Sequence, residues 1–208
     1  KRIGRAISTR LAADGWAVAI HNRDAGAEAD ALAGELISSG AQAVVISADL
    51  TDEAEIRRAF KDAGQALGPV TAVVNNASVF EPDDARSEDR ALWDLHMAVH
   101  VRAPFVLAQC LMAALPADRS GSVVNVIDQR VWNPTRHFTS YTLSKMALWD
   151  LTRVLARSLA PRVRVNGIGP GPVLPSQRQS DAEFEAQWRL MPLERAVDPR
   201  EVAAAAAF

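Results

Sequence analysis

The sequence predicts an α/β protein with a single Rossmann-type domain, in which helices flank a doubly wound parallel sheet. Short apolar segments rich in β-branched residues alternate with longer helical patterns along the whole chain, as in consecutive βαβ units. The length of 208 residues suits one large α/β domain, and there is no internal repeat, low-complexity tract or linker. Right-handed crossovers between such strands place the ligand crevice at the carboxyl ends of the strands.

Five segments are predicted as strands, because each is short, apolar and bounded by polar or turn-forming residues. They are Trp16–His21, Ala43–Ser47, Val70–Val74, Ser122–Ile127 and Val163–Ile168. Their β-branched, nearly continuous apolar character is typical of strands that helices cover on both faces.

The segments around these strands have the length and periodicity of helices. They are Gly4–Ala13, Ala25–Ser39, Thr51–Leu67, Leu92–Leu115 and Ser140–Leu159. Gly40 is a natural helix stop, and Gly68-Pro69 ends the third helix. A last helix is expected from Pro199, with Asp198 as its N-cap and Glu201 as the reciprocal capping residue.

Both ends of the chain look incomplete for such a domain. The sequence starts at Lys1 without a methionine, in what reads as a loop before a helix, and it stops at Phe208 inside an alanine-rich helical run. We therefore expect residues 1–208 to form one domain that lacks a first strand and a last strand. The one long irregular stretch, within residues 169–191, begins with a Gly-Pro-Gly run, and such a loop in a compact domain is usually functional.

Composition argues against several classes of function. The net charge is −2 with both signs interspersed, which disfavours a nucleic-acid or membrane-surface binder and leaves a small molecule as the expected partner. Cys110 is the only cysteine, which excludes an internal disulfide framework and a cysteine zinc cluster, and no metal site is expected. A reducing cytoplasm fits this usage, and there is no signal-peptide pattern or continuous apolar run of about 18 residues.

The residues that carry chemistry gather at one predicted edge of the sheet. Tyr141, the only tyrosine, and Lys145 share one face of a predicted helix, although this spacing alone is common on ordinary helix surfaces. Asp128 ends the preceding strand, thirteen residues before Tyr141, and residues 75–78 (Asn-Asn-Ala-Ser) end another strand. The combination at one edge favours a catalytic site.

These motifs, with Pro170-Gly171 after the next strand, resemble those of the short-chain dehydrogenase/reductase family in order and spacing over nearly the whole chain. The resemblance implies an NAD(P)-binding Rossmann domain in which Tyr141 donates a proton and the cofactor supplies a hydride. It also implies that Lys145 binds the nicotinamide ribose and that residues 169–191 form a substrate lid. A lysine ammonium about 5 Å away is expected to lower the pKa of Tyr141 by roughly two units from about 10.

The resemblance further implies a cofactor site. Gly4 matches the last glycine of the family's phosphate loop, at a helix N-terminus, and Arg2 stands where the family has its middle glycine. Arg23 is placed to pair with the 2′-phosphate of NADPH, and this favours NADPH over NADH although Asp24 lies close by. The other implied cofactor contacts are His21, Asn22, Asp49 (which meets the adenine), Asn76, Ala77, Ser78, Pro170 and Gly171.

Two departures from the common family pattern narrow the resemblance. Asp128 stands at the usual serine position, and His100 stands at that of the helix asparagine, where we expect only a supporting role. The aspartate, the Lys-Arg-Ile-Gly start and Asn-Ala-Ser-x-Phe at residues 76–80 are similar to pteridine reductases and bacterial dihydromonapterin reductases.

The pteridine reductase resemblance implies a substrate site. Phe80 would stack on a pterin ring, which is worth about 0.5–1.5 kcal/mol beyond burial, while Arg2 and Ser78 would hydrogen-bond pterin or phosphate. Three further residues either wall the pocket or belong to the packing: Trp132, Leu174 and Trp188.

The sequence thus predicts an NADPH-dependent reductase of a C=N bond in a dihydropterin-like substrate, in which Tyr141 and Asp128 protonate the ring nitrogen. One alternative is a carbonyl reductase that acts on a ketoacyl thioester or a sugar ketone, and another is an NADP-binding regulator without turnover. Family members usually pair through the two long helices, so Leu92–Leu115 and Ser140–Leu159 are expected to form a homodimer or homotetramer interface.

Overall fold

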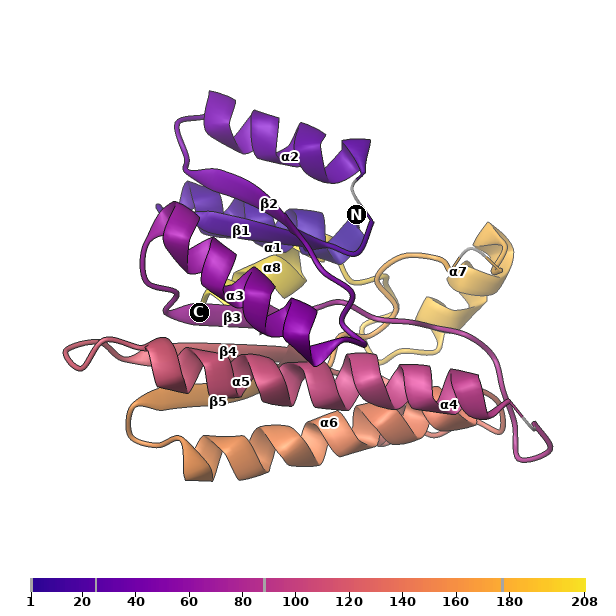
Figure 1. Ribbon diagram of the computed structural model, residues 1–208. Helices are drawn as coiled ribbons and strands as arrows, with labels where there is room; N and C mark the ends of the chain where they lie inside the picture. The colour runs from indigo at the N-terminus through magenta and orange to yellow at the C-terminus, as the bar shows by residue number, and fades with distance from the viewer. Residues whose placement is uncertain (1, 25, 88, 177) are drawn as a thin grey trace.

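The computed structural model describes residues 2–24, 26–87, 89–176 and 178–208. It has the predicted alternation of helices and parallel strands in one α/β domain (Figure 1). The strands are β1 (Val18–Asn22), β2 (Ala43–Ser47), β3 (Ala72–Asn75), β4 (Gly121–Val126) and β5 (Val163–Ile168). The bounds of β2 and β5 match the prediction, and those of the other strands differ from it by one or two residues.

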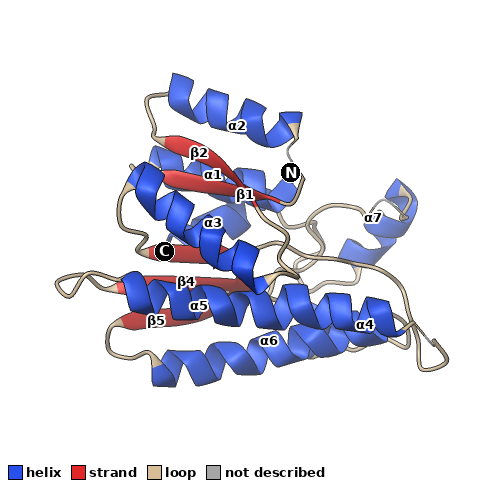
Figure 2. Ribbon diagram, viewed as in Figure 1, coloured by secondary structure: helices blue, strands red, loops and turns tan. Residues whose placement is uncertain are grey.

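The strands form two hydrogen-bonded groups, with β1 beside β2 and with the order β3-β4-β5 in the other (Figure 2). All pairs are parallel, for example with Ile20 opposite Val45 and Val123 opposite Val165. We expected one sheet, but no ladder joins β1 to β3 among the described residues. The break falls where the doubly wound order 3-2-1-4-5-6 places its first strand, so the topology agrees with that order.

Helices cover both faces of the β3-β4-β5 group, as the apolar strands predicted. The helices of the first half are α1 (Arg2–Ala13), α2 (Ala27–Ser38) and α3 (Glu53–Leu67), and those of the second are α4 (Arg90–Met97), α5 (Ala103–Ala114), α6 (Thr139–Ser158), α7 (Asp181–Arg189) and α8 (Pro199–Ala207). In β4, Val123 packs with Leu111 of α5 and Leu155 of α6, while Val124 on the other face packs with Ile7 of α1 and Ala203 of α8. This alternation places the core on both sides of the strand.

The predicted long helix Leu92–Leu115 is divided by a π-helical turn, η1 (Ala98–Arg102). Pro104 has no N–H to donate to the carbonyl of residue 100. The N–H of the preceding Ala103 donates to the Ala98 carbonyl, five residues back, which is the π-helical pattern. By length and composition the stretch from Arg90 to Ala114 could cross a membrane. Here it packs against α3 and α6 and buries the polar His96 and His100, as a core helix does.

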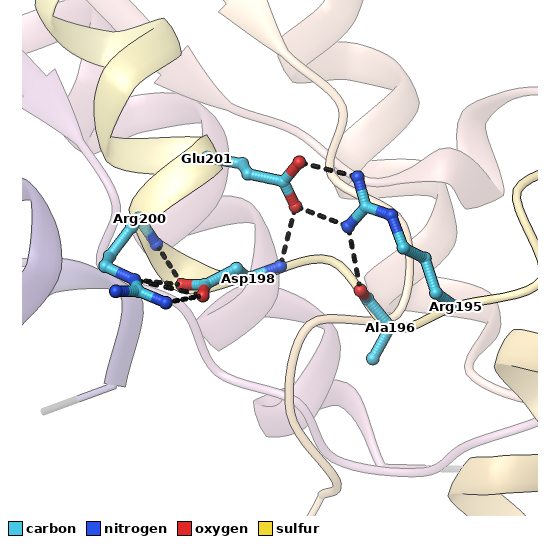
Figure 3. Close-up of polar contacts among 5 residues, drawn as sticks. All are labelled: Arg195, Ala196, Asp198, Arg200 and Glu201. Carbon is cyan, nitrogen blue, oxygen red and sulfur yellow. Dashed lines mark hydrogen bonds and ion pairs between the residues drawn. The ribbon is translucent and has the colours of Figure 1, made fainter.

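The helix ends follow the predicted signals. Gly40 and Gly68, with φ of 93° and 88°, end α2 and α3 in the left-handed region that glycine tolerates. At α8, Asp198 accepts from the Arg200 N–H at 2.8 Å and Glu201 accepts from the Asp198 N–H at 2.9 Å (Figure 3). The predicted start of the second helix, Ala25, lies outside the described residues, whereas α7 and the 3₁₀ turn η2 (Gln129–Val131) were not predicted.

Candidate active site

The three residues predicted to be catalytic meet at the carboxyl end of β4. Tyr141 and Lys145 lie on successive turns of α6, and Asp128 follows β4. The Tyr141 hydroxyl donates a hydrogen bond to Oδ2 of Asp128 at 2.7 Å, and Nζ of Lys145 donates to the Val126 carbonyl at 3.0 Å. Only 5% of Tyr141 and 3% of Lys145 is exposed. Their polar atoms therefore act in a largely desolvated environment.

The pKa of Tyr141 corrects the sequence prediction. Burial and the Asp128 carboxylate raise the pKa of Tyr141 and outweigh Arg130 and Ser78, which lower it. The predicted lowering by Lys145 is wrong here, because burial, which is not visible in the sequence, dominates. Burial also lowers the pKa of Lys145 to about 8, against the opposing effect of Asp128. Tyr141 therefore keeps its proton at neutral pH, as a proton donor must.

His100 joins the loop after β3 to α6. Its Nε2 accepts a hydrogen bond from the Val79 N–H at 3.1 Å, so the ring proton is on Nδ1. Nδ1 lies 2.7 Å from Ser144 Oγ, to which it donates, and Ser144 donates to the Tyr141 carbonyl at 2.7 Å. The Ser78 hydroxyl also lies 3.0 Å from Nε2. Burial lowers the pKa of His100 to about 2, so the ring is a neutral link that fixes Ser78 beside Tyr141.

Phe80 lies in the site but is already stacked. Its ring centroid lies 4.3 Å from that of Phe138, with an angle of 3° between the planes, and Tyr141 meets it edge-on at 4.8 Å. Cζ of Arg130 lies 5.3 Å from the Phe80 centroid and 4.7 Å from the Phe138 centroid. One face of Phe80 is therefore covered by Phe138, and a stacked substrate would use the other face.

The N-terminus of α1 fits the pyrophosphate that the sequence predicted there. A Cβ at Gly4 would lie 2.8 Å from Nδ2 of Asn76, so a larger residue here would displace the Asn76 side chain from the start of the helix. The first N–H groups of the helix are free of intrahelical partners and suit an anion. Arg2 has a φ of 52° at the start of this helix, and Lys1 of the same motif lies outside the described residues.

The residues predicted to choose the cofactor follow β1. Nη2 of Arg23 lies 3.2 Å from Oδ2 of Asp24, and both side chains are exposed. Asn22, at the end of β1, donates to the Asp24 carbonyl. An exposed pair of this kind is weak, so the guanidinium can exchange Asp24 for a phosphate at small cost. Asp24 competes with the 2′-phosphate for the Arg23 guanidinium, so Arg23 favours NADPH without excluding NADH.

The two other predicted residues at this end of the sheet are held by local contacts. Nε2 of His21 lies 2.8 Å from the Ala48 carbonyl, which ties the end of β1 to the end of β2. Oδ1 of Asp49 accepts from the N–H and the hydroxyl of Thr51, both at 2.8 Å, and these bonds lower the pKa of Asp49. Asp49 is therefore a fixed carboxylate at the carboxyl edge of the sheet.

The predicted lid contains α7 and is tied to the site at two points. Nη2 of Arg2 donates to the Leu174 carbonyl at 2.8 Å. Arg178 donates to the Phe80 carbonyl at 3.1 Å and pairs with Glu81. In Figure 1, α7 lies beyond the carboxyl ends of the strands, and the chain that leaves β5 leads to it. These contacts join the segment before α7 to distant parts of the chain at this edge.

The predicted pocket tryptophans lie further out. Trp132 is 61% exposed and packs edge-to-face on Trp149 of α6 at 5.1 Å between centroids. Trp188 lies on α7, where the Arg189 guanidinium is 5.5 Å from its ring. Among the described residues, neither tryptophan makes a ring contact with Tyr141, in contrast with Phe80.

Sequence reasoning missed four side chains near Tyr141 or Phe80. They are His96, Arg130, Phe138 and Arg178. His96 lies four residues before His100 on the same helix face, and its Nδ1 lies 2.7 Å from Ser140 Oγ, so the spacing was a usable signal. The capping box at Ser180 and Glu183 would have located α7, whereas no local pattern marks Arg130 or Arg178.

The parallel strands carry the desolvated Tyr141 and Lys145 at their carboxyl edge, and Gly4 lies at a helix N-terminus of the same domain. Together these features define a dinucleotide-dependent oxidoreductase. The family model described as enoyl-(acyl carrier protein) reductase matches residues 1–208. The chain belongs to the short-chain dehydrogenase/reductase family.

Two relatives show the range of this similarity. FolM alternative dihydrofolate reductase 1 from Brucella canis, solved in complex with NADP, is 48% identical with a TM-score of 0.95, over 99% of this chain and 82% of that chain. Galactitol 2-dehydrogenase (L-tagatose-forming) from Cereibacter sphaeroides is 36% identical over 99% of this chain and 82% of its own length. The family is therefore confirmed, and its members differ in substrate.

Proposed function

We propose that the protein is an NADPH-dependent reductase that transfers a hydride to a C=N bond of a dihydropterin-like substrate. The hydrogen bond of 2.7 Å from Tyr141 to Asp128 carries this proposal. A carboxyl group in contact with the proton donor can relay a proton to a ring nitrogen. The similarity to the Brucella protein, which is described as a dihydrofolate reductase, supports the same substrate class.

When bound, NADPH would supply the hydride for the carbon of the C=N bond, and the residues of the chain would supply the proton. The Tyr141 hydroxyl gives its proton to the nitrogen, so one C–H and one N–H bond form. Burial and Asp128 raise the pKa of Tyr141, which makes a tyrosinate beside the carboxylate costly. After Tyr141 has given its proton to the substrate nitrogen, the Asp128 carboxylate would take up a proton from water and pass it to the phenolate, so the proton balance closes.

The cofactor would be held by the chain's own groups around this donor. Gly4 and Asn76 form the close contact at the N-terminus of α1 that suits the pyrophosphate. Lys145 would hold the nicotinamide ribose, and Arg23 would meet the 2′-phosphate. Solved relatives in complex with NADP or NADPH, at 48% and 34% identity, support NADPH for this chain.

A carbonyl reductase is the second candidate. Galactitol 2-dehydrogenase at 36% identity and a 3-oxoacyl-[acyl-carrier-protein] reductase from Staphylococcus epidermidis at 26% identity support it. Asp128 favours the pterin, since a serine at this position, as in the common family pattern, suits a carbonyl oxygen better. A regulator without turnover is the least supported reading, because the Tyr141–Asp128 donor is assembled.

The test is a screen of NADPH oxidation with dihydropterins beside ketoacyl thioesters and sugar ketones. We expect kcat/KM to be highest for a dihydropterin, with NADPH preferred over NADH. A higher kcat/KM for a ketone would favour the carbonyl reductase, and binding of NADP without turnover on any substrate would support the regulator.

We also propose a homodimer or homotetramer in the cytoplasm that acts on small molecules and binds neither membrane nor nucleic acid. The exposed apolar side chains Trp93 of α4 and Leu143 and Val154 of α6 support pairing through these helices. Sedimentation of the purified protein tests the assembly, and a monomer at micromolar concentration would contradict it.

A further inference from the structure

Arg130 is a cation in the site that the proposed reaction does not use. Its guanidinium lies 4.7 Å from the Phe138 centroid and 5.3 Å from the Phe80 centroid, and it acts electrostatically on Tyr141. Among the described residues, the Arg130 side chain donates a hydrogen bond only to the neutral Thr135 hydroxyl, at 3.1 Å. The charge is therefore held beside the aromatic pair and close to the proton donor.

Most arginines with a polar contact in this protein are paired with an acid. Arg90 meets Asp94 at 2.8 Å and Arg102 meets Glu53 at 2.6 Å. Arg130 has no carboxylate within ion-pair distance among the described residues, although it is half-buried. A partly desolvated guanidinium without an acid is a ready site for a carboxylate or phosphate group, with a planar fork that binds such anions bidentately.

The loop that carries Arg130 holds a second cation without an acid. Thr135, which accepts from Arg130, donates to the His137 carbonyl at 2.9 Å, and this joins the two ends of the loop. Between them, Arg136 contacts only the His137 ring, at 3.1 Å, among the described residues. Arg136 and His137 line a hollow of about 320 Å³ with Asp84, Ala85 and Arg86, and Asp84 pairs with Arg86 at 3.4 Å. The hollow therefore carries both signs of charge, whereas Arg130 is the cation that lies against the aromatic pair.

From these contacts we propose that Arg130 is a specificity-determining residue, which binds the carboxylate of a dihydropterin whose side chain carries an aryl group and an acid. This inference rests on the proposed function and names the substrate class within it. Phe80 offers its free face to the pterin, Phe138 beside it offers an aromatic contact to the aryl group of such a side chain, and Arg130 at 4.7 Å from the Phe138 centroid meets its anionic end. A dihydropterin with a neutral polyol side chain makes neither contact.

The experiment compares 7,8-dihydrofolate, which has the aryl and acid groups, with 7,8-dihydrobiopterin, which has a short neutral side chain. Arg130→Gln should raise KM for dihydrofolate about tenfold and change KM for dihydrobiopterin less than about threefold. Raised ionic strength should increase KM for dihydrofolate in the unaltered enzyme and much less in Arg130→Gln, because salt screens the charge pair. Arg130→Lys should keep part of the preference, since it keeps the charge without the fork.

Arg153→Gln is the matched control, since Arg153 is an exposed arginine of α6 that pairs with Asp150. It should leave both KM values unchanged, and thermal unfolding of all variants confirms that they are folded. Equal changes for both substrates in Arg130→Gln, or no salt effect on dihydrofolate, would overturn the inference and leave the proposed function standing. An enzyme that reduces neither dihydropterin would overturn both.

Discussion

Asp128 accepts two hydrogen bonds at once, and these have different consequences. Oδ1 accepts from the Arg130 N–H at 2.9 Å and caps η2, while Oδ2 accepts from the Tyr141 hydroxyl at 2.7 Å. The first contact is structural, and an amide could replace it. The second contact sets the protonation of the donor, because the carboxylate raises the pKa of Tyr141.

Asp128→Asn separates these two roles. An asparagine keeps one acceptor for the Arg130 N–H but cannot relay a proton, so turnover of a dihydropterin should fall about 100-fold or more. The affinity for NADPH should stay within a few-fold of the original value, because Asp128 lies on the substrate side of the predicted site. Steady-state kinetics and NADPH titration measure the two quantities. Turnover near that of the original enzyme, with only a lower melting temperature, would show that Asp128 is merely a cap.

Arg23→Ala tests the choice of cofactor at the residue scale. Only NADPH carries the phosphate that Arg23 is placed to meet, so the Kd for NADPH should rise more than the Kd for NADH, by about tenfold. Fluorescence titration with each cofactor measures the ratio, and Arg10→Ala on α1 is an exposed control that pairs with Asp14. Equal losses for both cofactors would mean that Arg23 only shapes the loop.

At the scale of elements, the predicted lid contacts the site through the chain before α7. The capping box of α7 at Ser180 and Glu183 starts that helix locally, and Arg189 pairs with Glu185 within it. The contacts that reach the site come from the chain before α7, where Arg178 meets the loop after β3. These contacts can therefore be altered while α7 stays folded.

Arg178→Ala should loosen the predicted lid. The ion pair with Glu81 is exposed and worth at most about 1 kcal/mol, so KM for the substrate should rise about two- to fivefold. The Kd for NADPH and the melting temperature should change little. Arg189→Ala, which removes an ion pair of the same kind inside α7, is the matched control and should leave KM unchanged. A similar rise of KM in both variants would argue against a closing contact at Arg178.

At the scale of the whole molecule, buried polar links join the β3-β4-β5 group to α6 and to the loop after β3. Asn75 of β3 donates to Asn125 of β4 at 2.7 Å, and Asn125 donates to Thr152 of α6 at 2.8 Å. His100 adds the link from the loop after β3 to α6. Since His100 is 1% exposed and its pKa is lowered to about 2, folding excludes its proton.

The free energy of unfolding should therefore depend on pH through His100. The unfolded chain binds this proton below about pH 6.5 and the folded chain does not, so the contribution is complete above 6.5 and is lost as pH falls toward 2. Between pH 7 and 5 the loss from one such histidine is about 2 kcal/mol. Urea unfolding at the two values should show it, and His100→Asn should show a smaller difference. His137→Asn, at an exposed histidine, should not reduce the dependence.

The local signals in the sequence determined the elements and the catalytic pair. Apolar runs marked the strands within two residues, Gly40, Gly68 and Asp198 marked helix ends, and a four-residue spacing put Tyr141 and Lys145 on one face. Each of these features depends on a few neighbouring residues, which is why it can be predicted from the sequence.

Only the tertiary structure decided the environment of that pair. Three contacts there join residues that lie 44 to 98 positions apart in the sequence. They are the stack of Phe138 on Phe80, the hydrogen bond of His100 to Ser144 and that of Arg178 to the Phe80 carbonyl. The pKa of Tyr141 rises because packing removes water from the hydroxyl and leaves Asp128 against it. Burial and charge proximity follow from how distant segments pack, so no local pattern of residues encodes them.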